Sequence, residues 1–185
     1  MKHAFILVAV FLLGLGLLSC NVVTNPAGEV NNLVKNGSFE QNSHASLKYW
    51  MGIDSSKVKF VQDAPDDGGN WCASLPATQY EPSALHLAQE ITLSPHRYVL
   101  LFSFWAKRQS VNGRASLFIK NSDGQLLESK GKSVTDSVWT HYSLIDTVQI
   151  QSGQKLFVNL FGGGTEVVGG HTCFDLISLT VKQKN

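Results

Sequence analysis

Large aromatic and polar side chains occur at alternating positions of several short apolar segments of the chain. In residues 98–107 one face is apolar, whereas Trp105 and Lys107 belong to the opposite face. An aromatic ring outside the core offers an apolar surface for the C–H face of a sugar ring, and polar neighbours can bind its hydroxyls. Other segments alternate in the same way, so we expect these segments to pair in one sheet and their outward side chains to share one surface. The alternative is that a loop or the second sheet of a sandwich covers these side chains. The candidate binding residues are Trp105, Lys107, Phe118, Asn159 and Phe161.

The chain contains none of the compact motifs that position catalytic groups. It has no Gly-x-Ser-x-Gly, no His-Glu-x-x-His and no phosphate-binding loop, and its six histidines are scattered. Its 15 lysines and arginines balance 14 aspartates and glutamates, so we expect no strongly cationic surface. The sequence therefore indicates a protein that is not an enzyme and that has no nucleic-acid partner.

Residues 1–20 resemble the signal peptide of a bacterial lipoprotein. Their apolar stretch is shorter than the about 20 residues of a membrane span, and the Leu-Leu-Ser-Cys sequence that ends at Cys20 resembles a lipobox. The resemblance implies that Cys20 becomes the acylated N-terminus of the mature protein, carrying fatty acids such as palmitate. Asn21, in place of Asp, then implies sorting to the outer membrane. The alternative is an ordinary cleaved signal; in both cases the polar residues 21–31 form a flexible tether.

Two further cysteines, Cys72 and Cys173, form an even pair in an exported protein, and this favours a disulfide. The alternation of side chains argues against a disulfide. By alternation Cys173 lies on the same face of its strand as the apolar Ile177, whereas Cys72 lies on the face opposite the apolar Ala73. Two buried free thiols and a zinc site that includes His171 are the alternatives.

Turn signals separate the rest of the chain into short segments. Asn-Gly and Asp-Gly pairs and a run of three glycines at 162–164 lie between alternating or apolar stretches, which is typical of an all-β sandwich. No stretch with helical periodicity occurs beyond the signal peptide. The hydrophobic fraction of 43% and the charged fraction of 16% exclude wholesale disorder. We therefore predict one all-β domain over residues 32–182.

Four motifs stand out along this domain. They are Asn-Leu-Val-Lys-Asn-Gly-Ser-Phe-Glu at 32–40 followed by Trp50, Leu-Ala-Gln-Glu-Ile-Thr-Leu at 87–93 with the segment 98–107, Trp-Thr-His-Tyr at 139–142, and Phe-Asp-Leu-Ile-Ser-Leu at 174–179. In these motifs the chain resembles the jelly-roll carbohydrate-binding modules of the galactose-binding-like superfamily. The resemblance follows the order of that family and spans residues 32–181.

The resemblance implies a two-sheet jelly-roll β-sandwich with a glycan groove on its concave sheet. It also implies that Trp50 and Trp139 pack inside, and that Glu40 and Asp175 hold a structural calcium ion together with backbone carbonyls. Leu176 stands where the family often has a second Asp, so the site has one carboxylate fewer. The alternative is that the two carboxylates cap strand ends.

These features together favour a non-catalytic carbohydrate-binding lipoprotein at the cell envelope. Its expected partners are a polysaccharide or oligosaccharide on the concave sheet and the membrane through the lipid anchor. A structural or protein-interaction lipoprotein that uses the same fold without binding sugar is the alternative, and a subunit of an envelope complex is a third class.

Overall fold

The computed structural model describes residues 31–165 and 167–184, so the predicted signal peptide, Cys20 and the tether up to residue 30 lie outside the described residues. No helix in the described ranges is long and apolar enough to cross a membrane. The elements are β1 (Glu40–Gln41), β2 (His44–Ala45), the 3-10 turn η1 (Ser55–Lys57), β3 (Lys59–Val61), β4 (Cys72–Pro76), β5 (Leu87–Ile91), β6 (His96–Gln109), β7 (Gly113–Lys120), β8 (Leu126–Val134), β9 (Thr140–Ile150), β10 (Lys155–Phe161) and β11 (His171–Lys184).

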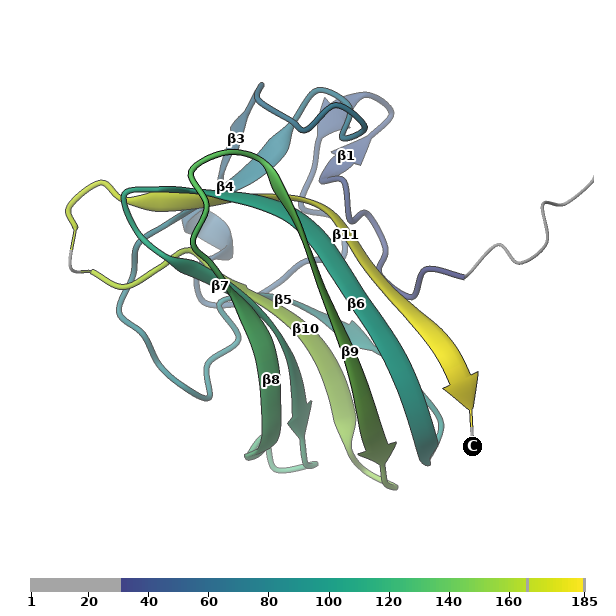
Figure 1. The fold of residues 1–185 in the computed structure, drawn as a ribbon. Helices are drawn as coiled ribbons and strands as arrows, with labels where there is room; N and C mark the ends of the chain where they lie inside the picture. Colours follow the sequence, from purple (N-terminus) through teal and green to yellow (C-terminus); the bar gives the residue numbers. More distant parts are fainter. Residues whose placement is uncertain (1–30, 166, 185) are drawn as a thin grey trace, which may run out of the picture.

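Two antiparallel sheets pack face to face, and a separate short hairpin joins β1 to β2. The four-stranded sheet has the order β5-β10-β7-β8, and the five-stranded sheet has the order β3-β4-β11-β6-β9. Many strands that are neighbours in a sheet are not consecutive in the chain, because the chain crosses from one sheet to the other, as it does between β6 and β7. This is a jelly-roll β-sandwich, and it confirms the predicted fold class. In Figure 1 the five-stranded sheet arches over the four-stranded one, whose outer face lies on the inside of the bend.

The hydrophobic core lies between the two sheets. Alternation along β6 turns Leu100, Phe102 and Phe104 inward, where each is fully buried, and this confirms the predicted core face of that strand. Trp50 is also buried, with its ring 5.1 Å from that of Phe39. Burying one such large apolar side chain contributes about 1.5–3 kcal/mol to stability. The core therefore holds the two sheets together and leaves their outer faces to carry a site.

Candidate functional site

The five predicted binding residues do not lie on one sheet. Trp105 and Lys107 lie on β6 of the five-stranded sheet. Phe118 on β7, and Asn159 and Phe161 on β10, belong to the four-stranded sheet. None of the five belongs to the core between the sheets, so their side chains point outward from opposite sides of the sandwich. The expectation of one shared surface is wrong, because the chain changes sheets between β6 and β7.

The outer face of the four-stranded sheet is partly covered by the chain that connects β4 to β5. Phe118, Asn159 and Phe161 have exposed fractions of only 4%, 3% and 7%. Asn159 holds the connection in place, since its Oδ1 accepts a hydrogen bond from the His86 N–H (2.8 Å) and its Nδ2 donates to the Ala84 carbonyl (3.3 Å). These side chains form no open stacking surface, which corrects the expectation of a glycan groove built on them.

A buried acid–histidine pair anchors the same connection. His86 Nδ1 lies 2.8 Å from Asp54 Oδ2, and Asp54 also accepts hydrogen bonds from Lys57 (3.0 Å) and Thr78 (2.9 Å). Burial opposes the charge on Asp54, but the hydrogen bonds from His86, Lys57 and Thr78 hold the pKa of Asp54 below its usual value. The His86 ring also packs 4.5 Å from that of Phe161. Because Asp54 and His86 are each 1% exposed, the pair is shielded from solvent and clamps the connection.

A hollow of about 370 Å³ lies on the outer face of the five-stranded sheet, and we call it the tryptophan hollow. Two half-buried indole rings line it, one from Trp105 on β6 and the other from Trp139 immediately before β9. Its other wall is the segment 64–67, in which Asp66 and Asp67 are exposed. The tryptophan hollow thus combines aromatic surface with carboxylates that can accept hydrogen bonds from hydroxyl groups.

Lys107 and Asp63 hold the ring of Trp139 in place. Lys107 Nζ forms an ion pair with Asp63 and lies 5.0 Å from the centre of the Trp139 ring. Trp139 Nε1 donates to Asp63 Oδ1 (3.3 Å). The hydrogen bond from Lys107 outweighs the effect of burial and, with that from Trp139, lowers the pKa of Asp63. On the neighbouring position of the sheet, the His141 ring packs 5.6 Å from that of Trp105.

Trp139 is the site residue that the sequence analysis missed, because the family resemblance assigned it to the interior. In the structure β6 and β9 pair with Trp105 opposite His141 and Ala106 opposite Thr140. Continuing this pairing by one residue places Trp139 opposite Lys107. Because residues directly opposite each other point to the same face, Trp139 lies on the outer face with Lys107. The alternation of side chains from Trp139 into β9 could have indicated its face, but only once the pairing of β6 with β9 is known.

Glu40 and Asp175, the predicted calcium ligands, both contact the segment 65–71. Glu40 Oε1 accepts hydrogen bonds from backbone N–H groups of this segment, among them that of Trp71 at 2.6 Å. Asp175 is fully buried on β11; its Oδ1 accepts the Leu176 N–H at 2.7 Å, and its Oδ2 has no hydrogen-bond partner among the described residues. Burial raises the pKa of Asp175 to about 8, with the Leu176 N–H opposing and the charge of Glu40 adding to the rise. The carboxyl groups of Glu40 and Asp175 are thus close enough to interact, in surroundings that water reaches poorly.

The backbone of the segment 65–71 approaches both carboxylates closely. A Cβ atom on Gly68 would lie 2.2 Å from Asp175 Oδ2, and one on Gly69 would lie 2.8 Å from the carboxylate oxygens of Glu40. No group of three or more His, Cys, Asp or Glu side chains gathers within the described part of the chain, so further ligands of a cation here would be carbonyls and water. An all-oxygen donor set with an unpaired buried carboxylate oxygen fits calcium, which binds six to eight oxygens.

Cys72 on β4 and Cys173 on β11 lie on the same face of the five-stranded sheet. Cys173 is opposite Ser74, which makes Cys72 its diagonal neighbour. The objection that the two are out of phase is therefore wrong, since a β-bulge between Asp175 and Ser178 puts both Phe174 and Ile177 in the core and leaves Cys173 on the outer face with Cys72. The hydrogen bond to Cys173 and burial raise the pKa of the Cys72 thiol. Both thiols are free and buried, and the disulfide stays a prediction. His171 joins no cluster of metal-ligating side chains in the described ranges.

Comparison with known proteins finds similarity to solved structures. No protein-family model and no curated protein matches the chain. A family 16 carbohydrate-binding module is similar over 80% of this chain and 99% of its own, with a TM-score of 0.57 and 18% identity. The module TmCBM61, solved in complex with β-1,4-galactotriose, is similar over 82% of this chain and 99% of its own, with a TM-score of 0.53 and 19% identity.

One part of the enzymatically active domain of tailspike protein 4 from bacteriophage CBA120 has a similar fold. It is similar over 81% of this chain, with a TM-score of 0.54 and 22% identity, but this chain spans only 21% of that structure. At such identities the likeness concerns the fold. The chain has the jelly-roll β-sandwich found in carbohydrate-binding modules.

Proposed function

We propose that this domain is a non-catalytic glycan-binding domain and that the tryptophan hollow holds the sugar. The observation that carries the proposal is that two half-buried indole rings from different segments line one hollow, with exposed carboxylates beside them. Stacking on Trp105 and Trp139 would cover the C–H faces of a sugar, while Asp66 and Asp67 accept hydrogen bonds from its hydroxyls. Because the side chain of Trp139 is already held in place, it loses little conformational entropy when a sugar binds.

Two observations support a sugar ligand and a role without catalysis. The structural likeness is to carbohydrate-binding modules, one of which was solved with β-1,4-galactotriose. An enzyme needs acid and base groups that converge on an open cleft. The acid–histidine pair of this domain, Asp54 and His86, is instead buried under the β4–β5 connection.

The second part of the proposal is that acyl chains on Cys20 hold the domain at the cell envelope, at the outer membrane. The lipobox-like sequence supports it. Several acyl chains anchor a protein stably where one chain would not. The polar tether over residues 21–31 would then let the domain reach glycans near the membrane surface.

The third part is a structural calcium ion held by Glu40 and Asp175. The buried, unpartnered oxygen of Asp175 and the nearby charge of Glu40 support it. A divalent cation there would neutralise both carboxylates and hold the segment 65–71 against β11. Part of the same segment, Pro65 to Asp67, forms a wall of the tryptophan hollow, so the ion would also keep that wall in position.

A glycan array probed with the mature chain carrying Cys20→Ala tests the glycan proposal. We expect a defined set of oligosaccharides to be retained. Trp105→Ala and Trp139→Ala should each weaken that binding about ten- to a hundredfold, because one aromatic stacking contact contributes about 1–3 kcal/mol. Tyr80→Ala is the matched control, since Tyr80 is a half-exposed aromatic of the β4–β5 connection, which covers the opposite sheet, and its ring packs on Phe161.

The other outcomes separate the competing explanations. If Tyr80→Ala weakens binding and the tryptophan variants do not, the sugar binds on the four-stranded sheet. If either tryptophan variant unfolds, thermal melting shows it, and a more conservative change to Phe then tests stacking. If no glycan is retained, the second candidate, a protein-interaction lipoprotein, is favoured; the covered outer face of the four-stranded sheet is the observation that supports it.

A further inference from the structure

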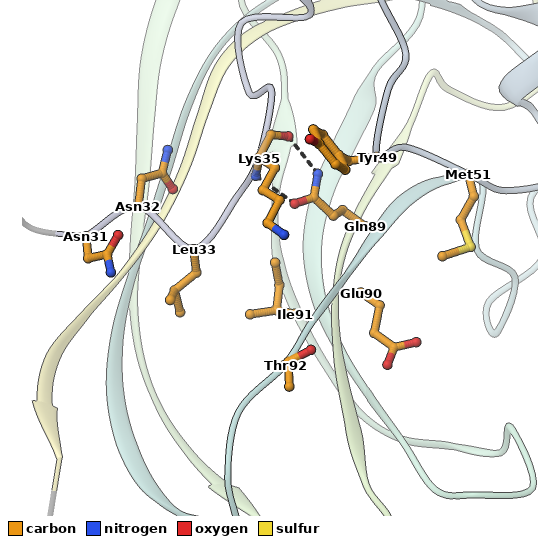
Figure 2. A pocket seen from close by; sticks show the side chains of 10 residues that line it. All are labelled: Asn31, Asn32, Leu33, Lys35, Tyr49, Met51, Gln89, Glu90, Ile91 and Thr92. Atoms are coloured by element: carbon orange, nitrogen blue, oxygen red, sulfur yellow. Dashed lines mark hydrogen bonds between the residues drawn. The ribbon is translucent and has the colours of Figure 1, made fainter.

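A second depression, which we call the Tyr49 groove, runs beside β5. It measures about 390 Å³ and lies between this edge strand and the segment 31–35. Figure 2 shows Lys35, Tyr49 and Met51 around it, with Ile91 and Thr92 on the β5 side. It shares no lining residue with the tryptophan hollow, and it lies at the edge of the other sheet.

Tyr49 presents its ring to solvent from a strained backbone. Its φ is +78°, in the left-handed region that residues other than glycine rarely adopt, and its side chain is 50% exposed. The backbone on both sides is tied down, since Trp50 N–H donates to the Leu47 carbonyl (2.8 Å) and Asn36 Nδ2 donates to the Lys48 carbonyl (3.3 Å). Strain of this kind persists where the surroundings enforce it and is frequent at binding sites.

Two lysine ammonium groups accompany this ring without a carboxylate partner. Lys35 Nζ lies 5.4 Å and Lys48 Nζ 5.2 Å from the ring centre of Tyr49. Neither forms an ion pair with any described residue. The acidic residue that lines the groove, Glu90, is already paired with Lys155 at 3.0 Å. Lys35 in the lining of the groove and Lys48 beside the same ring, just outside that lining, therefore give an excess of positive charge around the exposed ring of Tyr49.

Gln89 fixes the position from which Lys35 reaches the groove. This buried side chain accepts a hydrogen bond from the Lys35 N–H (2.7 Å) and donates one to the Lys35 carbonyl (2.8 Å), as the dashed lines in Figure 2 show. Met51 is held to β5 in a similar way, by two backbone hydrogen bonds to Ala88 (2.8 and 2.6 Å). The backbone of the groove is thus organised before any ligand arrives, which lowers the entropic cost of binding.

We propose that the Tyr49 groove binds an acidic sugar residue, a uronate, within a glycan chain. The sugar ring would pack on Tyr49 and Met51, and its carboxylate would bind Lys35 and Lys48, because a carboxylate is a stronger partner for an ammonium group than the face of a ring. Thr92 would accept or donate a hydrogen bond to a hydroxyl. A neutral sugar would leave both ammonium groups unused, which is why the charge of the groove selects an acidic one. This site is additional to the tryptophan hollow and does not depend on it.

Calorimetric titration of the mature chain carrying Cys20→Ala tests the site. The ligands are α-1,4-galacturonotriose and a mannuronate trimer, each compared with its methyl ester, which keeps the ring and removes the charge. We expect at least one acidic trimer to bind and its ester to bind at least tenfold more weakly. Lys35→Met and Tyr49→Asn should each weaken binding of the acid about tenfold or more. Asn tolerates the left-handed backbone, so Tyr49→Asn removes the ring without adding strain.

One control separates this site from general charge effects. Lys132→Met removes an exposed lysine of β8 and should leave binding of the acidic trimer unchanged. Binding of the trimer that Trp139→Ala weakens and Lys35→Met does not would instead place the trimer in the tryptophan hollow and overturn the proposal. The proposal is overturned if neither acidic trimer binds, if acid and ester bind equally, or if Lys35→Met has no effect. It is also overturned if inorganic phosphate or vesicles containing anionic lipid compete as well as the trimer, because the groove would then be a general anion site.

Discussion

Replacing Asp175 by Asn should stabilise the metal-free protein at neutral to mildly alkaline pH and abolish its response to calcium. Burial, with a contribution from the charge of Glu40, raises the pKa of Asp175 from 3.8 to about 8. The folded protein therefore keeps a proton that the unfolded chain has lost, and the free energy of unfolding falls as the pH rises from about 4 to about 8. The difference between the two pKa values corresponds to at most about 6 kcal/mol. Relaxation and water penetration reduce the cost of a buried charge, so we expect a loss of about 2–4 kcal/mol.

Thermal unfolding in EDTA between pH 4 and pH 8 measures this effect. For a domain of this size the expected loss lowers the Tm of the unmodified protein by about 5–15 °C. Asp175→Asn should remove most of this fall, because its side chain cannot ionise. Calcium at pH 8 should raise the Tm of the unmodified protein and leave that of the variant unchanged, since the ion replaces the proton on the carboxylate.

The matched control for this experiment is Asp123→Asn, which changes an exposed carboxylate in the turn between β7 and β8. It should keep both the pH dependence and the calcium response of the unmodified protein. A Tm that stays level across this pH range in EDTA would refute the reasoning about Asp175. So would a calcium response that persists in Asp175→Asn.

Two further predictions concern the cysteines. Thiol labelling of the unfolded, unreduced chain carrying Cys20→Ala should find neither Cys72 nor Cys173 reactive, because an oxidising envelope would join these neighbours in a disulfide; two labelled thiols per chain would contradict this. Mass spectrometry of the unmodified protein from membranes should show an N-terminus at Cys20 with acyl chains attached, and fractionation should place it in the outer membrane. An intact Met1, or a start after Cys20, would exclude the lipid anchor.

The alternation of side chains and the turn signals in the sequence were sufficient to predict an all-β sandwich and the face of residues 98–107 that enters the core. Leu100, Phe102 and Phe104 could be assigned to the interior because successive side chains of a strand point to opposite faces, whatever its neighbours are. The family motifs likewise predicted that Glu40 and Asp175, 135 positions apart in the chain, have a common role, and the structure places both against one segment.

Which strands lie side by side was decided only by the tertiary structure. Alternation says that Trp105 and Phe118 point outward but not from which sheet, because sheet membership depends on pairing between distant segments. The same limit hid Trp139, which reaches the outer face through the register of β9 on β6, and the closeness of Cys72 to Cys173, which follows from the register of β4 on β11. Coverage of the four-stranded sheet by the β4–β5 connection is also non-local, since Asn159 recruits backbone groups more than 70 positions away. Local periodicity determines the direction of a side chain, whereas the packing of distant segments determines what that side chain meets.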